Sequence, residues 1–210
     1  MHEVLPGVYH WETSHPRIGI EVSSYWLEDG GVLLDPLVPE QEGVEWFAAR
    51  PQQPRAVLLS NRHHLRDAIR FREAFGSPIM CTRAGLHEFA ADEQVVGFDP
   101  GERLPGSVLA KQLGGICPDD TALYLEGHRA LAFADGIVRA GAGGALGFVP
   151  DSLMDDPPAT KRALLEGVSR LLAELDFEHV LLAHGAPLIG DGRELLQELV
   201  DVEGRTAFES

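Results

Sequence analysis

The chain has 210 residues, 44% of them hydrophobic and 24% charged, and a formal net charge of −16. These proportions suit a packed globular chain and exclude a wholly disordered one. So acidic a surface repels phosphate backbones and anionic lipid, and we therefore expect no nucleic-acid partner and no membrane partner.

Two cysteines, Cys81 and Cys117, are too few for a disulfide framework. No apolar run approaches the ~20 residues that span a bilayer. Residues 1–7 lack the charged and apolar pattern of a secretory leader. We therefore expect a cytoplasmic protein with reduced thiols.

The first half of the chain is rich in predicted strands. Runs of β-branched and aromatic residues predict strands at 8–11, 18–27 and 32–34, with a hairpin turn at 29–31. A short helix is predicted at 41–49, and two prolines end it. The apolar run 56–59 predicts a buried strand that leads into the polar cluster 61–67, and a helix follows to Phe75.

The second half repeats this alternation. Strands are predicted at 79–82, 108–113, 122–125, 130–133 and 180–182, and a weak helix at 84–91. Residues 141–147 are rich in Gly and Ala and predict a mobile loop. Apolar residues recur with helical spacing from Leu164 to Leu175, and a last helix opens at Asp191. We interpret residues 1–210 as one domain with two β-rich halves, approximately 1–100 and 101–210.

Three predicted strands end in side chains that can do chemistry. They lead into the cluster after Leu59, into Asp135 and into His184. Strand ends that meet at one edge of a sheet are a usual place for sites. Each also has a purely structural explanation: His63 or His64 as a cap or solvated histidine, and the other two as turn residues before glycine.

Five segments follow one another along the chain in the order in which a known family carries similar segments. They are LPGVY at 5–9, VLLD at 32–35, VLLS at 57–60, AFAD at 132–135 and LLAHGAP at 181–187. Together they resemble the metallo-β-lactamase superfamily over nearly the whole chain. The resemblance implies a four-layer αββα sandwich of the α+β class and, if the protein is an enzyme, a hydrolase of this superfamily.

The resemblance also implies where metal ligands would fall. Laid on the chain directly after Ser60, the family's ligand positions are occupied, in order, by Asn61, His63, Leu65, Arg66, Ile116, Asp135 and His184. Only His63, Asp135 and His184 keep the family's residue type. A shift of one residue would rescue only His64.

The substitutions make a two-zinc site improbable. In the family the first zinc would use Asn61, His63 and Ile116, but an amide is a poor zinc ligand and isoleucine is none. The second would use Leu65, Arg66, Asp135 and His184, and a fixed positive charge opposes a cation there. We expect a depleted site and no conventional dizinc hydrolase, so the default expectation is no cofactor.

Several hypotheses remain open. Arg66 could replace the second metal by pairing with Asp135. Alternatively, His63, Asp135 and His184 could hold one divalent ion (Zn, Fe or Mn) and hydrolyse a small ester or thioester. Cys117 with a nearby histidine is a remote third possibility. A non-catalytic protein that binds a small molecule, or a scaffold that forms homo-oligomers, is compatible with the same residues.

Overall fold

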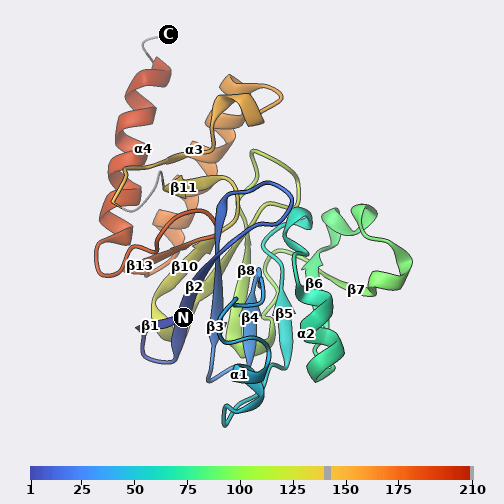
Figure 1. The fold of residues 1–210 in the computed structure, drawn as a ribbon. Coiled ribbons are helices and arrows are strands. Elements are labelled where there is room, and N and C mark those ends of the chain that lie inside the picture. Colours follow the sequence, from blue (N-terminus) through green and yellow to red (C-terminus); the bar gives the residue numbers. More distant parts are fainter. Residues whose placement is uncertain (140–142, 209–210) are drawn as a thin grey trace.

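Two β-sheets face each other in the computed structural model, which describes residues 1–139 and 143–208. Figure 1 shows the sheets packed at the centre, with helices on either side. The loop predicted at 141–147 lies partly outside the described residues. Residues 143–145 form no helix or strand, whereas the end of the predicted loop belongs to a strand, β12 (Leu146–Phe148).

The first sheet has the order β1-β2-β3-β4-β5-β6-β7. Its strands are β1 (His2–Leu5), β2 (Val8–Ser14), β3 (Glu21–Leu27), β4 (Val32–Leu34), β5 (Ala56–Leu58), β6 (Ile79–Thr82) and β7 (Val95–Phe98). Strands β1 to β4 pair antiparallel, whereas β4 to β7 pair parallel. Because parallel neighbours run the same way, β4 and β5 end at one edge of the sheet.

The second sheet has the order β13-β10-β9-β8. Its strands are β8 (Val108–Gln112), β9 (Thr121–Leu125), β10 (Ala130–Phe133) and β13 (His179–Leu182). Strands β10 and β13 are parallel, and Phe133 is opposite Leu182. Asp135 and His184 each follow that pair by two residues, so the register itself brings them together. A small hairpin, β11 (Ile137–Arg139) with β12, follows β10.

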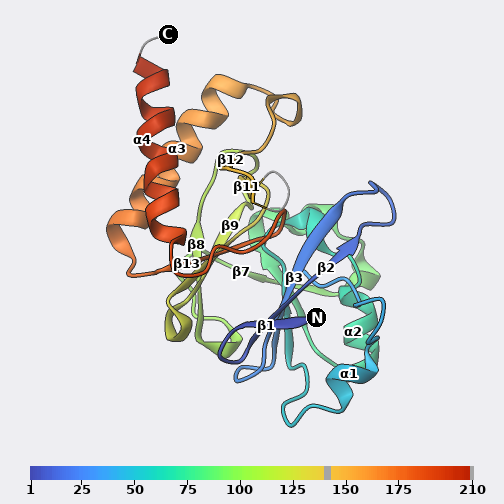
Figure 2. The ribbon, with the colours of Figure 1, turned by 60° about the vertical axis from the view of Figure 1, so that its left-hand side comes forward.

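Helices cover the outer faces of the two sheets. Figure 2 shows α3 (Pro157–Glu174) and α4 (Gly192–Phe208) on one side, and α1 (Glu45–Ala48) and α2 (Ala68–Phe75) on the other. Each interface is a separate apolar cluster: one under α3 and α4, one between the sheets, and one under α1 and α2. Three apolar interfaces separate four layers, which confirms the αββα sandwich.

Some elements differ from the prediction for local reasons. The helix expected at 41–49 is shortened to α1, because Gly43 adopts a left-handed φ of 63°. Residues Arg83–Glu88 form a 3-10 helix where an α-helix was predicted. Within the described ranges, no helix is long and apolar enough to cross a membrane.

Candidate active site

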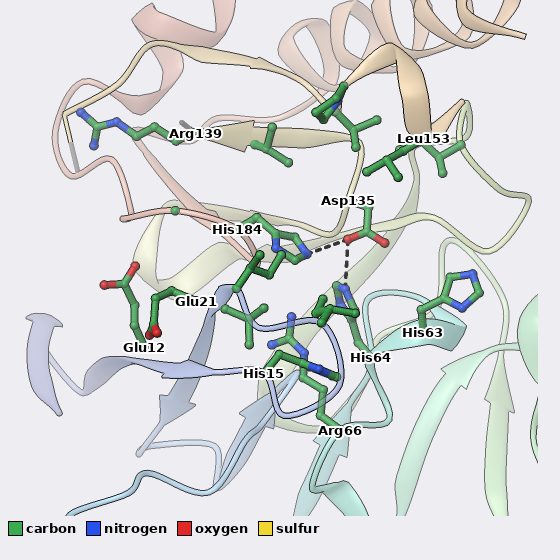
Figure 3. A pocket seen from close by; sticks show the side chains of 18 of the residues that line it. Glu12, His15, Glu21, His63, His64, Arg66, Asp135, Arg139, Leu153 and His184 are labelled. Atoms are coloured by element: carbon green, nitrogen blue, oxygen red, sulfur yellow. Dashed lines mark hydrogen bonds and ion pairs between the residues drawn. The ribbon is translucent and has the colours of Figure 1, made fainter. Parts of the chain in front are cut away.

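Polar side chains from both sheets meet at the edge where β4, β5, β10 and β13 end. Asp35 follows β4 and Ser60 follows β5, while Asp135 and His184 come from the second sheet. Figure 3 shows His64, Asp135 and His184 turned toward one another. The cluster is therefore assembled from both β-rich halves of the chain.

A short turn decides which histidine enters the cluster. Asn61 caps the 3-10 helix η1 (Arg62–His64), and its side-chain oxygen accepts a hydrogen bond from the backbone N–H of His63 at 2.9 Å. Asp119 accepts a hydrogen bond from the backbone N–H of Arg62 at 2.7 Å and forms an ion pair with its guanidinium. The turn buries His64, which is 4% exposed, and leaves His63 on the surface.

The Nδ1 side of His64 is fixed by Asp35 and Ser60. Nδ1 lies 2.9 Å from Asp35 Oδ2 and 2.9 Å from Ser60 Oγ. Ser60 also donates to Asp35 through its hydroxyl and, at 2.8 Å, through its backbone N–H. Asp35 adopts a φ of 45°, a left-handed conformation that costs a non-glycine residue about 1 kcal/mol or more. The backbone of Asp35 is therefore strained at the residue that orients the His64 ring.

Asp135 accepts three hydrogen bonds. Its Oδ1 lies 3.1 Å from Nε2 of His64 and 2.8 Å from Nε2 of His184, and its Oδ2 accepts from the Asn61 amide at 2.6 Å. Burial would raise the pKa of Asp135, but the charge of His64 and the bonds from both imidazoles hold it well below the usual value. Asp135 is therefore an ionised carboxylate.

His64 lies between two carboxylates and carries their counter-charge. Burial alone would lower its pKa, but Asp35 and Asp135 outweigh burial and raise the pKa of His64 to about 9. Burial likewise opposes ionisation of Asp35, yet His64 and Arg66 lower the pKa of that carboxyl. At neutral pH and without metal, the imidazolium donates a hydrogen bond to each carboxylate.

A further acidic group, Asp120, is buried near the cluster. Asp120 is 0% exposed, and neither carboxyl oxygen has a hydrogen-bond partner in the part of the chain that the structure describes. Burial raises the pKa of Asp120 well above its usual value, and Asp135 raises it further. Its carboxyl therefore favours the neutral form more than a solvent-exposed aspartate does.

Three potential metal ligands converge in this cluster: His64, Asp135 and His184 offer ligand atoms that all lie within 4.8 Å of one another. The expected set was His63, Asp135 and His184. The first of these is corrected to His64, because the capped turn points His64, and not His63, at Asp135. Two imidazoles and a carboxylate are a donor set that Zn²⁺, Fe²⁺ and Mn²⁺ accept. The second ring nitrogen of His64 meets Asp35, as is usual for metal-binding histidines.

Arg66 occupies the site differently from the hypothesis. Its Nη1 donates to the backbone carbonyls of Ser23 and Asp35, each at 2.7 Å. Among the described residues it forms no ion pair with Asp135, which is bound by His64 instead. The φ of Arg66 is 41°, and this left-handed backbone leads the side chain toward β3 and β4.

The structure places the remaining predicted positions as follows. Asn61 uses its amide to donate to Asp135. Ile116 presents an apolar side chain to the site cavity. Leu65 packs against the cluster under α1 and α2, away from the site. Cys117 is buried, and burial with the nearby Asp120 raises the pKa of its thiol, so it is a poor nucleophile.

The cluster forms the floor of a cavity of about 780 Å³. Its walls are largely apolar, and they include Ile18, Ile20, Val22, Val138, Val149 and Leu153. His63, His64, Arg66, Asp135 and His184 are among its polar lining residues. Figure 3 shows His184, Asp135, His64 and Arg66 below Leu153. The volume and lining are typical of a site for a small organic molecule.

One glycine allows the β11–β12 hairpin to pack closely against the chain after β13. Gly185 has a φ of 101°, and a Cβ at this position would lie 2.5 Å from the Arg139 carbonyl oxygen. The Arg139 backbone N–H donates to the His184 carbonyl at 3.0 Å. Only glycine fits this approach, so the His-Gly pair at 184–185 has a steric reason.

The sequence pattern missed His64 as the inward histidine and did not assign a role to Asp35 or Ser60. One signal was present: an asparagine directly before Arg62-His63-His64 is a good cap for a helical turn. In such a turn the side chain that points into the site is that of His64, and not that of His63, which the family spacing implies.

Comparison with known proteins identifies the family. The sequence profile of the metallo-beta-lactamase superfamily matches residues 2–202, and the chain belongs to this superfamily. Comparison with curated proteins gave no significant match.

Solved structures show the same fold at low identity. TTHA1623, crystallised in a di-iron-bound form, is 20% identical with a TM-score of 0.67, covering 90% of this chain and 98% of its own. The metallo-β-lactamase FIM-1 from Pseudomonas aeruginosa, in a mono-zinc form, is 13% identical with a TM-score of 0.69. The match covers 98% of this chain and 94% of FIM-1. A metallo-β-lactamase from Hirschia baltica is 18% identical with a TM-score of 0.67, covering 96% of each chain.

Proposed function

We propose that this protein is a hydrolase that binds one divalent transition-metal ion through His64, Asp135 and His184 and cleaves a small ester or thioester with an apolar body. The observation that carries the proposal is the convergence of these three ligand atoms within 4.8 Å on the floor of an apolar cavity. Similar structures that hold two irons or a single zinc support a metal-dependent role.

The donor set fits one ion and not two. His64, Asp135 and His184 offer two imidazole nitrogens and a carboxylate, which leaves open positions on a metal. Asp35 holds Nδ1 of His64, so that Nε2 is the atom presented to the site. A second ion would meet Ile116 and the Arg66 guanidinium, and neither is a ligand.

Each side chain then has a separate task. When bound, the metal supplies a Lewis acid and lowers the pKa of water. Asp35 and Ser60 orient the His64 ring, and Asn61 orients Asp135 through its amide. The isoleucines and Leu153 keep water away from the apolar part of the substrate.

A second function is favoured by the charge balance of the site. His64 donates to Asp35 and Asp135 together, so both carboxylates have a cationic hydrogen-bond donor without metal. The same cavity could then bind an apolar small molecule without turning it over. A ligand of this kind would raise the melting temperature, because it binds only the folded state.

Metal content separates the two functions, and adjacent histidines provide a matched pair of variants. Protein purified without chelator is supplemented with zinc, iron or manganese, desalted and assayed for bound metal and for hydrolysis of p-nitrophenyl hexanoate and a hexanoyl thioester. The expected result is one equivalent of metal and metal-dependent hydrolysis in the wild type. His64→Ala should lose both, whereas His63→Ala, on the exposed side of the same turn, should keep the metal.

Metal well below one equivalent after all three supplements would end the single-metal proposal. Equal metal loss in His63→Ala and His64→Ala would contradict the assignment of His64 as the ligand. One equivalent of metal without hydrolysis of either substrate class would favour the binding function.

A further inference from the structure

Ser23 joins the first sheet to the chain segment that carries His184. Strand β4 pairs with residues 25–27 of β3, so Ser23 lies beyond the part of β3 that β4 covers. The Ser23 backbone N–H donates to the Ala183 carbonyl at 2.9 Å, and its hydroxyl donates to the Gly185 carbonyl at 3.0 Å. One residue of β3 therefore holds the residues immediately before and after His184.

A second side chain of β3 extends this contact. The Tyr25 hydroxyl donates to the Leu182 carbonyl at 2.9 Å and accepts from the Leu182 backbone N–H at 3.0 Å. Ser23 and Tyr25 point to the same face of β3, because alternate residues of a strand share a face. Their bonds follow the chain from Leu182 to Gly185, so the segment that presents His184 is fixed along its length.

His10 orients the Ser23 hydroxyl. Nε2 of His10 lies 2.9 Å from Ser23 Oγ, and both side chains are buried. A carbonyl can only accept, so the single hydroxyl hydrogen of Ser23 is committed to Gly185 and His10 must donate. The neutral ring then carries its proton on Nε2, which agrees with an enclosed Nδ1 that has no partner in the described chain. These two bonds in series form the His10–Ser23 relay.

The relay keeps its direction at neutral pH. Burial lowers the pKa of His10 to about 4, and the charges of His2 and the N-terminal amino group act in the same direction. The ring is therefore neutral at pH 7 and keeps one proton to donate. Two buried hydrogen bonds in series restrict the side chains more than either bond would alone.

The imidazole held in this way is one of the three potential metal ligands. His184 Nε2 lies 2.8 Å from Asp135 Oδ1, and Figure 3 shows the two side chains turned toward one another. We propose that Ser23 and His10 are positioning residues, which set the orientation in which the His184 ring meets a single metal ion. Their effect on metal binding rests on the proposed function, whereas the placement of His184 does not.

Two buried serines provide a matched comparison. Ser77 is 1% exposed, and its hydroxyl donates to the Pro54 carbonyl at 2.9 Å, before β5 and β6 begin, whereas the site lies where strands end. Ser23→Ala and Ser77→Ala each take one buried hydroxyl from a backbone carbonyl, so both should unfold at a lower urea concentration. In competition with a chromophoric chelator, Ser23→Ala should bind Zn²⁺ about 10- to 100-fold more weakly than the wild type. Ser77→Ala should stay within about twofold of it.

Two substitutions of His10 test the second bond of the relay. His10→Phe removes the donor to Ser23, and Zn²⁺ affinity should fall by about threefold to tenfold. His10→Gln places an amide N–H near the former Nε2 position, and it should recover the affinity to within about twofold of the wild type.

A further measurement needs no metal. In labelled, metal-free protein, the Nε2 proton of His184 should give a hydrogen-bonded resonance in the wild type and in Ser77→Ala, because Asp135 accepts it. In Ser23→Ala this resonance should shift or exchange with water. If the wild type binds no Zn²⁺, the hydrolase proposal ends, and the resonance decides the placement of His184 alone.

Several results would overturn the positioning role. They are an unchanged His184 resonance in Ser23→Ala, wild-type Zn²⁺ affinity in that variant when the wild type binds the ion, and an equal loss of affinity in Ser77→Ala. Equally weak binding by His10→Gln and His10→Phe would exclude His10 from the role. If Ser23→Ala does not fold, the His184 resonance in the two His10 variants decides instead: it should shift in His10→Phe and not in His10→Gln.

Discussion

Nδ1 of His64 lies 2.9 Å from Oδ2 of Asp35, and both side chains are buried. This contact joins the turn after β5 to the end of β4, within the first sheet. Through Nε2 the same ring reaches Asp135 of the second sheet at 3.1 Å. One imidazole thus connects the two sheets, and its protonation has consequences for the whole sandwich.

Stability without metal should fall as the pH becomes alkaline. The pKa of His64 is raised from 6.5 to about 9 in the folded protein, so the folded state binds the proton more tightly than the unfolded chain. The stabilisation is complete below pH 6.5 and is lost as the pH rises through 9. It amounts to at most about 3 kcal/mol.

Urea unfolding at intervals from pH 6 to pH 10, with a chelator present, measures this loss. His64→Gln should flatten the profile over that range. An unchanged alkaline decline in His64→Gln would assign it to another group.

Asp35→Asn should weaken both the fold and the metal site. The substitution leaves the buried His64 charge with one carboxylate fewer, and breaking such a pair costs roughly 3 kcal/mol. It also removes the acceptor that orients His64, which should lower metal affinity by about 10- to 100-fold. Denaturant unfolding and a competitive metal titration measure the two effects.

Asp99→Asn is the comparison variant for Asp35→Asn. Asp99 forms an exposed ion pair with Arg83, and such pairs contribute under about 1 kcal/mol. If both variants lose the same stability, Asp35 has no special role in holding His64.

Gly185→Ala should disturb the position of His184. The added methyl would lie 2.5 Å from the Arg139 carbonyl oxygen, on a backbone with a φ of 101°. We expect a loss of roughly 2 kcal/mol in unfolding free energy, together with weaker metal binding. Gly127→Ala is the control, since a Cβ there meets nothing within 4 Å. If Gly185→Ala keeps the wild-type unfolding free energy, the β11–β12 hairpin can move away from the added methyl without destabilising the protein.

Neither cysteine should react in the native protein. Cys81 and Cys117 are buried, and burial raises the pKa of the Cys81 thiol to about 12 and that of the Cys117 thiol in the same direction. A disulfide reagent at pH 8 should label both only after denaturation. Rapid native labelling of Cys117 would reopen its role as a nucleophile.

Most of the fold could be predicted because its elements follow simple patterns. The strands at 79–82 and 130–133 were predicted with their observed bounds, and the apolar stripe predicted α3. Strand β7 was missed: it is short, contains Gly97 and lies at a sheet edge. Strands β11 and β12 pair with each other and have three residues each, which is too short for an alternation of apolar and polar residues to be recognised.

The candidate site was predicted only in part, for a reason of backbone geometry. Asp135 and His184 follow paired strands, and sequence order was enough to place them. The choice between His63 and His64 depends on a capped turn, and the direction of Arg66 depends on its positive φ. The spacing of residues in a motif predicts neither the inward histidine nor the direction of Arg66, because both depend on local dihedral angles.

Leu65 packs beneath α1 and α2, on the far side of the turn from the cavity. Leu65→Asp would therefore place a carboxylate in an apolar interface and would not restore a metal ligand. Histidine at 61 would likewise replace the amide that donates to Asp135 and caps the turn. Single substitutions at these positions would therefore not build a second metal site. Such a site would require a different path of the backbone through residues 61–66.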